Sequence, residues 1–247
     1  MGIGIPPGHM SYDPAAAPAA RVRMAGREPP HMAEFAGEAL ACVRAERLVF
    51  KDLSFALSDG GALRLTGPNG SGKSSLLRVM AGFIRPAAGA LTWDGATVTK
   101  DRETHGSRLA FIGHLDAAKP VLTVDESVRF WARLYGADDP AAATTAALEA
   151  FDLLRLADFP VRLLSSGQRR RLALSRLLAA PAALWLLDEP TTGLDAASVA
   201  RLEAAIAAHR KTGGMVALAT HTDVALPDAE TLALERFAPT PALEANE

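Results

Sequence analysis

The 247-residue chain has little cysteine, few aromatic residues and no surplus of basic charge. Its one cysteine, Cys42, allows no internal disulfide and no cysteine-based zinc or iron–sulfur cluster. The 26 basic residues are balanced by 28 acidic ones, so no basic excess indicates a nucleic-acid partner. Apolar runs are too short for a membrane-spanning helix. We therefore expect a globular cytoplasmic protein, held at a membrane only through partners.

The two ends of the chain differ from its middle in composition and in periodicity. Residues 1–37 are rich in proline, alanine and glycine, show no helical or strand period, and lack the charged start and apolar run of a secretory signal. We predict a disordered leader over residues 1–37, one domain over residues 38–237 and a short tail over residues 238–247.

Within the predicted domain, short apolar runs alternate with helical patterns. Strand-like runs occupy residues 40–45, 48–57, 62–66, 90–95, 108–113, 183–189, 215–221 and 231–236. Helical patterns occupy residues 74–83, 123–136, 140–159, 167–180 and 195–214. This alternation predicts an α/β fold with a mainly parallel sheet covered by helices on both faces. The stretch from about 115 to 166 has no convincing strand and predicts an inserted helical subdomain.

A glycine-rich motif joins the run at 62–66 to the helical pattern that follows. Its residues are Gly67, Pro68, Asn69, Gly70, Ser71, Gly72, Lys73 and Ser74, which have the spacing of a phosphate-binding loop. Glycines let backbone N–H groups wrap phosphates, and the helix N-terminus adds a positive dipole end. We expect Lys73 to reach the β- and γ-phosphates of a nucleotide and the Ser74 hydroxyl to ligate Mg²⁺.

Two acidic residues follow the apolar run 184–187. A buried strand there would place Asp188 beside the phosphate loop, because ligands collect at the carboxyl ends of parallel strands. We predict that Asp188 holds Mg²⁺ and that Glu189 polarises the attacking water as a general base. By themselves the two acids could equally be a helix cap and a solvated neighbour; the phosphate loop makes the catalytic interpretation the stronger one.

Three further motifs complete an ordered set. Leu164-Ser165-Ser166-Gly167-Gln168 precedes a helix, Thr191-Thr192-Gly193-Leu194-Asp195 follows the acids, and His221 follows the last but one strand-like run. Each alone could be structural, as an ordinary helix N-cap or a lone histidine. In this order, over residues 40–236, the chain resembles the nucleotide-binding domain of the ABC ATPases, a P-loop NTPase fold.

The resemblance implies a fold and a shared nucleotide site. It adds an antiparallel β subdomain beside the parallel sheet and makes residues 115–166 the inserted helical subdomain. It implies that two chains face each other with ATP between them, so that Ser165 and Gly167 of one contact the γ-phosphate held by Lys73 of the other. The same resemblance assigns nucleotide contacts to Ser75, Gln168 and Asp195. His221 would touch the γ-phosphate and hold the attacking water with Glu189.

Some positions depart from the family pattern. Ser166 replaces a glycine and crowds a backbone expected near phosphate. Arg44 falls at or near the place of the aromatic that stacks on adenine; since a flat guanidinium also stacks on a ring, we predict weak base selectivity. His114, a candidate metal-site residue, stands where the family usually has glutamine. Because Mg²⁺ prefers oxygen ligands, we expect His114 to act through water or to mark a contact with a membrane partner. We expect Arg169 and Arg170 on a solvated helix face.

Residues 111–136 narrow the resemblance to the ATP-binding subunits of bacterial cytochrome c maturation complexes. That implies an ATPase motor with ATP and Mg²⁺ as ligands, a homodimer when ATP is bound, and separate integral membrane subunits at the cytoplasmic face of the inner membrane, in haem export or haem-carrier release. No Cys-x-x-Cys-His motif occurs, so haem is not expected to be bound covalently. Two alternatives stay open: an ATPase subunit of another small-molecule or lipid exporter, and a regulatory nucleotide-binding module, against which Glu189 and His221 argue.

Overall fold

The computed structural model describes residues 33–239 apart from residue 181. The predicted leader lies outside the described residues as far as residue 32, and the predicted tail from residue 240 onward. The first strand, β1 (Glu34–Arg44), begins inside the segment expected to be a leader. Residues 34–37, which the sequence pattern assigned to the leader, are therefore part of β1.

An antiparallel sheet contains β1, β2 (Arg47–Ser58), β4 (Ala88–Trp93) and β5 (Ala96–Thr97). Its strand order is β2-β1-β4-β5, and all three neighbouring pairs run antiparallel. Ala45 and Glu46 both have positive φ, which is the backbone of a two-residue hairpin turn between β1 and β2. The turn pairs Arg44 with Arg47 and fixes Arg44 at the end of the hairpin.

A parallel sheet contains β3 (Ala62–Thr66), β6 (Leu109–Ile112), β7 (Leu184–Asp188), β8 (Met215–Ala219) and β9 (Glu230–Ala233). The strand order is β6-β7-β8-β3-β9, with all pairings parallel. Both the parallel sheet and the antiparallel subdomain agree with the predicted fold class.

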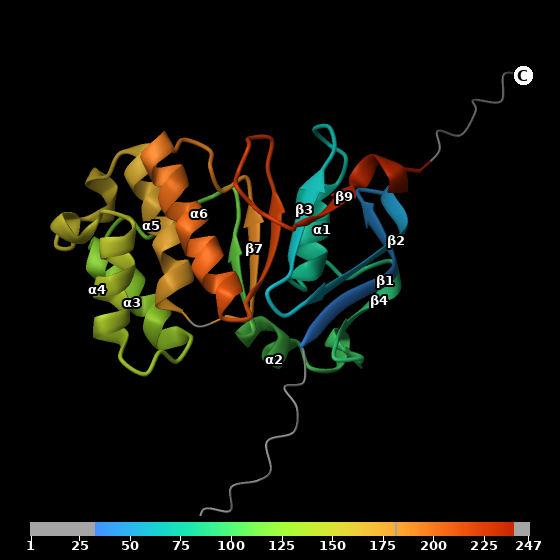
Figure 1. The fold of residues 1–247 in the computed structure, drawn as a ribbon, viewed down its shortest axis with the longest axis horizontal. Helices are drawn as coiled ribbons and strands as arrows, with labels where there is room; N and C mark the ends of the chain where they lie inside the picture. Colours follow the sequence, from blue (N-terminus) through green and yellow to red (C-terminus); the bar gives the residue numbers. More distant parts are fainter. Residues whose placement is uncertain (1–32, 181, 240–247) are drawn as a thin grey trace, which may run out of the picture. The chain divides into compact units, whose positions relative to one another are not determined.

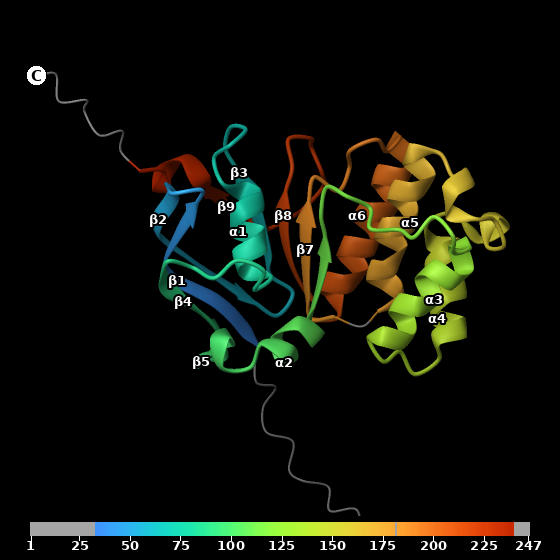
Figure 2. The same cartoon turned by 180° about the vertical axis from the view of Figure 1, so that it is seen from behind.

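Helices lie on both sides of the parallel sheet, as Figures 1 and 2 show from opposite sides. They are α1 (Lys73–Met80), α2 (Arg102–Ser107), α3 (Val124–Leu134), α4 (Pro140–Ala150), α5 (Ser166–Ala179) and α6 (Ala196–Lys211). Helix α1 lies between the two sheets, whereas α5 and α6 cover the other face of the parallel sheet. Helices α3 and α4 pack on α5 and form the helical layer expected between residues 115 and 166.

Strand β7 shows why the parallel sheet is stable. Its side chains alternate between two cores: Leu184 and Leu186 join the cluster around α1 and the antiparallel sheet, while Trp185 and Leu187 join the cluster of the helical layer. All five residues of the strand are buried. A continuous apolar run, rather than an alternating one, is what burial on both faces requires.

Two predicted elements have different ends in the structure. The helix expected over residues 140–159 stops at Ala150, because Asp152 adopts a left-handed backbone and the N–H of Leu153 donates to the C=O of Leu148. A 3-10 turn, Leu154–Leu156, follows. The last strand ends at Ala233 and continues as the 3-10 helix Leu234–Phe237.

Candidate functional site

The predicted site residues come from the carboxyl ends of neighbouring parallel strands. The phosphate loop follows β3, and His221 follows β8. Asp188 ends β7 and Glu189 follows it, while His114 follows β6. Since β6, β7, β8 and β3 are consecutive in the sheet and parallel, these ends share one edge. Residues that are far apart in the chain are therefore brought together by the strand order alone.

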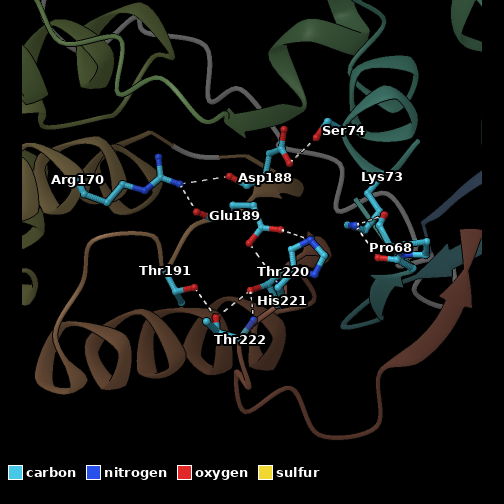
Figure 3. Close-up of polar contacts among 11 residues, drawn as sticks. Pro68, Lys73, Ser74, Arg170, Asp188, Glu189, Thr191, Thr220, His221 and Thr222 are labelled. Atoms are coloured by element: carbon cyan, nitrogen blue, oxygen red, sulfur yellow. Dashed lines mark hydrogen bonds and ion pairs between the residues drawn. The ribbon is translucent and has the colours of Figure 1, made fainter. Parts of the chain in front are cut away.

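The phosphate loop is a tight turn that ends in α1. Gly72, the residue that caps α1, has φ +104°, and a Cβ there would lie 2.7 Å from Cγ1 of Val49. Only glycine satisfies both conditions without strain. Lys73 is 7% exposed, and its Nζ donates to the C=O groups of Gly67 at 2.7 Å and Pro68 at 3.0 Å (Figure 3). The ammonium group is thus folded over the loop that would hold the phosphates.

One hydroxyl of the loop is buried without a partner. Among the described side chains, Oγ of Ser71 is fully covered and makes no hydrogen bond. An unpaired buried polar atom is costly, and a phosphate oxygen in the loop would satisfy it. The loop is therefore suited to an anion on its own geometry.

Ser74 and Asp188 provide oxygen ligands for a cation. The Ser74 hydroxyl donates to Oδ1 of Asp188 at 2.9 Å, and the Asp188 side chain is buried beside the loop. Within the described part of the chain, no group of three or more histidine, cysteine or acidic side chains could hold a metal without help. This donor set fits Mg²⁺, which binds through a few protein oxygens together with substrate phosphates.

Glu189 and His221 face each other across the same edge (Figure 3). The backbone N–H of His221 donates to Oε2 of Glu189 at 3.3 Å, and Nε2 of His221 lies 3.5 Å from Oε1. Glu189 has φ +47°, a conformation that costs a non-glycine residue free energy, and its own N–H donates to the C=O of Ala219 at 2.8 Å. The surrounding contacts must therefore hold the turn in place.

Three threonines connect the loops that carry Glu189 and His221. Oγ1 of Thr222 lies 2.6 Å from Oγ1 of Thr191, two residues after Glu189, and 2.9 Å from Oγ1 of Thr220, directly before His221. The N–H of Thr222 also donates to Oγ1 of Thr220 at 3.1 Å. This hydroxyl cluster fixes the backbone on both sides of His221.

Arg170 is not on a solvated face, so the prediction is wrong for this residue, whereas Arg169 is half-buried. Arg170 is 4% exposed, and its guanidinium points from α5 toward the turn at the end of β7 (Figure 3). It shares a face of α5 with the buried residues Ala173, Leu174 and Leu177. The helical spacing of those apolar residues is the signal that indicates a buried Arg170, and the charge of the arginine run obscures it.

A cavity of about 530 Å³ opens at this edge. Its lining includes ten predicted site residues, namely Arg44, Asn69, Gly70, Gly72, Lys73, Ser74, Ser75, His114, Glu189 and His221. Val49 and Arg78, which lie in none of the sequence motifs, also line it, as does Thr192 of the 191–195 motif. Gly67, Pro68 and Ser71 belong to the loop, and Asp188 lies behind Ser74; none of these four is part of the lining.

The residues of the 164–168 motif are not part of the cavity lining. Ser165 caps α5: its Oγ accepts from the N–H of Gln168 at 3.2 Å, and Oε1 of Gln168 accepts from the N–H of Ser165 at 2.8 Å. Gly167 lies against Gly193, since a Cβ on it would be 3.2 Å from the C=O of Gly193. Ser165 and Ser166 are exposed, and Gly167 and Gln168 are half-buried, whereas Leu164 is buried.

Asp195 has a comparable capping role at α6. Its Oδ1 accepts from the N–H of Ser198 at 2.8 Å. Hydrogen bonds from the side chain and the backbone of Ser198 hold the pKa of Asp195 below its ordinary value. Like Ser165, Asp195 is not part of the cavity lining.

The described residues, 33–239 without 181, include no helix that is long and apolar enough to cross a bilayer. A family model described as ABC transporter matches residues 50–192 of the chain. The chain is 58% identical to the "Cytochrome c biogenesis ATP-binding export protein CcmA" of Rhodospirillum rubrum, over 86% of this chain and 90% of that protein. It is 55% identical to the protein of the same name from Paramagnetospirillum magneticum, over 83% of this chain and 95% of that one.

Solved structures share the fold. The ATP-binding subunit of an ABC transporter matches with a TM-score of 0.70 and 25% identity, over 76% of this chain and 79% of that one. The cbiO1 protein of Clostridium perfringens, part of the ABC transporter complex cbiONQ, matches with a TM-score of 0.68 and 22% identity, over 81% and 83%.

Proposed function

The chain belongs to the ABC transporter family as one of its ATP-binding, ATP-hydrolysing subunits, and we propose that it serves the transporter complex of cytochrome c biogenesis. The observation that carries this proposal is the 58% identity to a relative with that name over 90% of the relative's length. The meeting of the phosphate loop, Asp188, Glu189 and His221 at one sheet edge supports turnover rather than a purely regulatory role.

The substrate phosphates would lie in the loop 67–74. Lys73 would exchange its bonds to the loop carbonyls for the β- and γ-phosphates, and the first N–H groups of α1, which have no partner within the helix, would donate to the same oxygens. Arg44 at the end of the hairpin would stack on the base. Mg²⁺, when bound at Ser74 and Asp188, supplies positive charge that neutralises the phosphates.

Glu189 would accept the proton of the attacking water. Its carboxylate is 25% exposed at the cavity, and the contact with His221 would hold it on the side of the γ-phosphate. His221 would keep both the water and the phosphate in line. His114, on the rim, would act through water or mark the contact with a membrane subunit.

The complete site would need two chains. Ser165, Gly167, Gln168 and Asp195 lie outside the cavity lining of their own chain, on a surface free to face the cavity of a second copy. With Gly167 against Gly193, one chain offers residues 165–168 and 193–195 as a single surface. We propose a homodimer in the ATP-bound state, docked on integral membrane subunits at the cytoplasmic face of the inner membrane.

Capture of the tagged chain tests the assignment to a complex. Cytochrome-maturation membrane subunits should come down with it, and loss of the gene should abolish holo-cytochrome c. The wild-type gene and Glu149→Gln should restore it, whereas Glu189→Gln should not, because Glu149 is exposed on α4 and Glu189 is in the cavity. Capture of another exporter's membrane subunit with normal cytochrome c would instead establish the second candidate function.

A further inference from the structure

The guanidinium of Arg170 uses all five of its N–H donors, and three of its acceptors are successive carbonyl groups. Its Nη2 donates to the C=O of Asp188 at 3.2 Å and of Glu189 at 2.7 Å, and its Nε donates to the C=O of Pro190 at 3.0 Å. These three carbonyls form the turn on which the Glu189 carboxylate stands. An arginine offers five donors in a rigid planar fork, so the turn can match them in only one conformation.

The two remaining donors join this turn to the loop after β6. Nη1 donates to the C=O of Gly113 at 2.8 Å and to Oδ1 of Asp116 at 3.2 Å. Asp116 also balances the buried positive charge, since the Arg170 side chain is 5% exposed. One side chain of α5 thus holds both the turn of Glu189 and the loop that carries His114.

We propose that Arg170 is a positioning residue for Glu189, a role that rests on the proposed function of Glu189 as the base. Glu189 is in a left-handed conformation that the chain would leave if its carbonyls lost their donors. The carboxylate would then turn away from His221 and from the water. Small displacements of a catalytic group lower turnover strongly while leaving substrate binding at other residues intact.

Kinetics of the full chain in complex with its membrane subunits test this role. We expect Arg170→Gln and Arg170→Lys each to lower kcat for ATP hydrolysis by about tenfold or more, with KM for ATP within about threefold of wild type. Lysine keeps the charge beside Asp116 but has a single nitrogen that cannot reach three successive carbonyls. Both variants should therefore fail.

Arg171→Gln is the matched control. Arg171 lies on the same helix, is partly buried, and donates to the C=O groups of Phe151 and Asp152 and to the Asp152 carboxylate, away from the catalytic turn. We expect Arg171→Gln to lower the thermal unfolding temperature while kcat, measured below that temperature, stays within about twofold. Glu189→Gln is assayed alongside, because it tests the base itself.

Each outcome has a distinct meaning. If Glu189→Gln abolishes hydrolysis and the Arg170 variants lower kcat at unchanged KM, the positioning role holds. If Glu189→Gln abolishes hydrolysis but the Arg170 variants lose no more kcat than Arg171→Gln, Arg170 is structural and the inference is wrong. If Glu189→Gln turns over at the wild-type rate, the proposed function of Glu189 fails first.

Discussion

Thr222 is the central residue of the hydroxyl cluster that joins the loops of Glu189 and His221. Its Oγ1 contacts both Thr191 and Thr220, so one substitution removes two contacts. Thr222→Val keeps the shape and removes the hydroxyl, and we expect kcat to fall by about three- to tenfold because His221 is held less well. Steady-state ATP hydrolysis measures this. Thr222→Ser should keep kcat within about twofold; equal rates for the valine variant and wild type would contradict the role.

Arg44 ends the first hairpin and lines the cavity where the base would lie. A guanidinium plane stacks on any base, so equilibrium binding should give Kd values for ATP and GTP within about threefold of each other. Arg44→Ala should weaken both by about two- to fivefold, as expected for an exposed stacking contact. Arg47→Ala, its cross-strand neighbour outside the cavity lining, is the control. A strict ATP preference in the wild type would contradict this assignment.

Among the elements, β7 contributes side chains to both hydrophobic cores and ends at the site. Leu186 is fully buried on an internal strand between β6 and β8. Leu186→Ala should lower the free energy of unfolding by about 2–5 kcal/mol, measured by urea denaturation. Leu115→Ala, at a side chain that is 81% exposed, should change it by no more than about 0.5 kcal/mol. A loss at Leu186 within that same margin would show that β7 does not support the core.

The contact between α6 and β7 makes stability depend on pH. His209 stacks on Trp185 at 3.9 Å, and burial lowers the pKa of His209 to about 4. Between pH 4 and about 6.5 the unfolded chain binds more protons at His209 than the folded chain does. The contribution of His209 to the free energy of unfolding is therefore complete above about pH 6.5 and is lost as the pH falls through that window. Its size is about 1–2 kcal/mol once partial exposure is allowed for.

Urea midpoints at pH 7.5 and pH 5 measure that loss. His209→Phe keeps a ring against Trp185 but has no proton to bind, so its midpoint should change less with pH than the wild-type midpoint. Some dependence should remain, because desolvation also lowers the pKa of His105, whose ring nitrogens contact Trp93 and Met80. Identical pH dependence of His209→Phe and wild type would contradict the assignment.

The elements that could be predicted are those with a local signal. The phosphate loop and β7 follow from a glycine spacing and an apolar run, and parallel pairing then places Asp188 beside Ser74. The end of α4 was missed because its left-handed residue is Asp152 and not glycine. Arg170 and Thr222 were missed because their partners lie in distant loops, and nothing in their own neighbourhood in the sequence names those partners.

At the scale of the whole molecule, the proposed division of the nucleotide site between two chains is testable by mixing. Ser165→Asp keeps a good N-cap for α5 while placing a negative charge against the γ-phosphate, and Lys73→Ala disables the other half. Each variant alone should be inactive. Mixed in equal amounts, random pairing leaves one intact site in about half of the dimers, so we expect up to about a quarter of the wild-type rate.

The control for this experiment keeps the cap and changes only the charge. Ser165→Asn caps the helix equally well and is neutral, so it should retain much more activity than Ser165→Asp. Full hydrolysis by Ser165→Asp alone would contradict a site shared between chains, and so would a mixture no more active than its two components.

The strand order has a consequence for synthesis on the ribosome. The loop at 67–74 leaves the ribosome early, yet its strand β3 lies in the sheet between β8 and β9, which are made near the end of the chain. Such pairings between distant segments form slowly, because the entropy cost of closing a large loop comes before any stabilising contact is made. A nascent chain that has not reached Met215 thus carries the phosphate-loop sequence without β3's partner strands, and capture of nucleotide should begin only after β8 and β9 have been made.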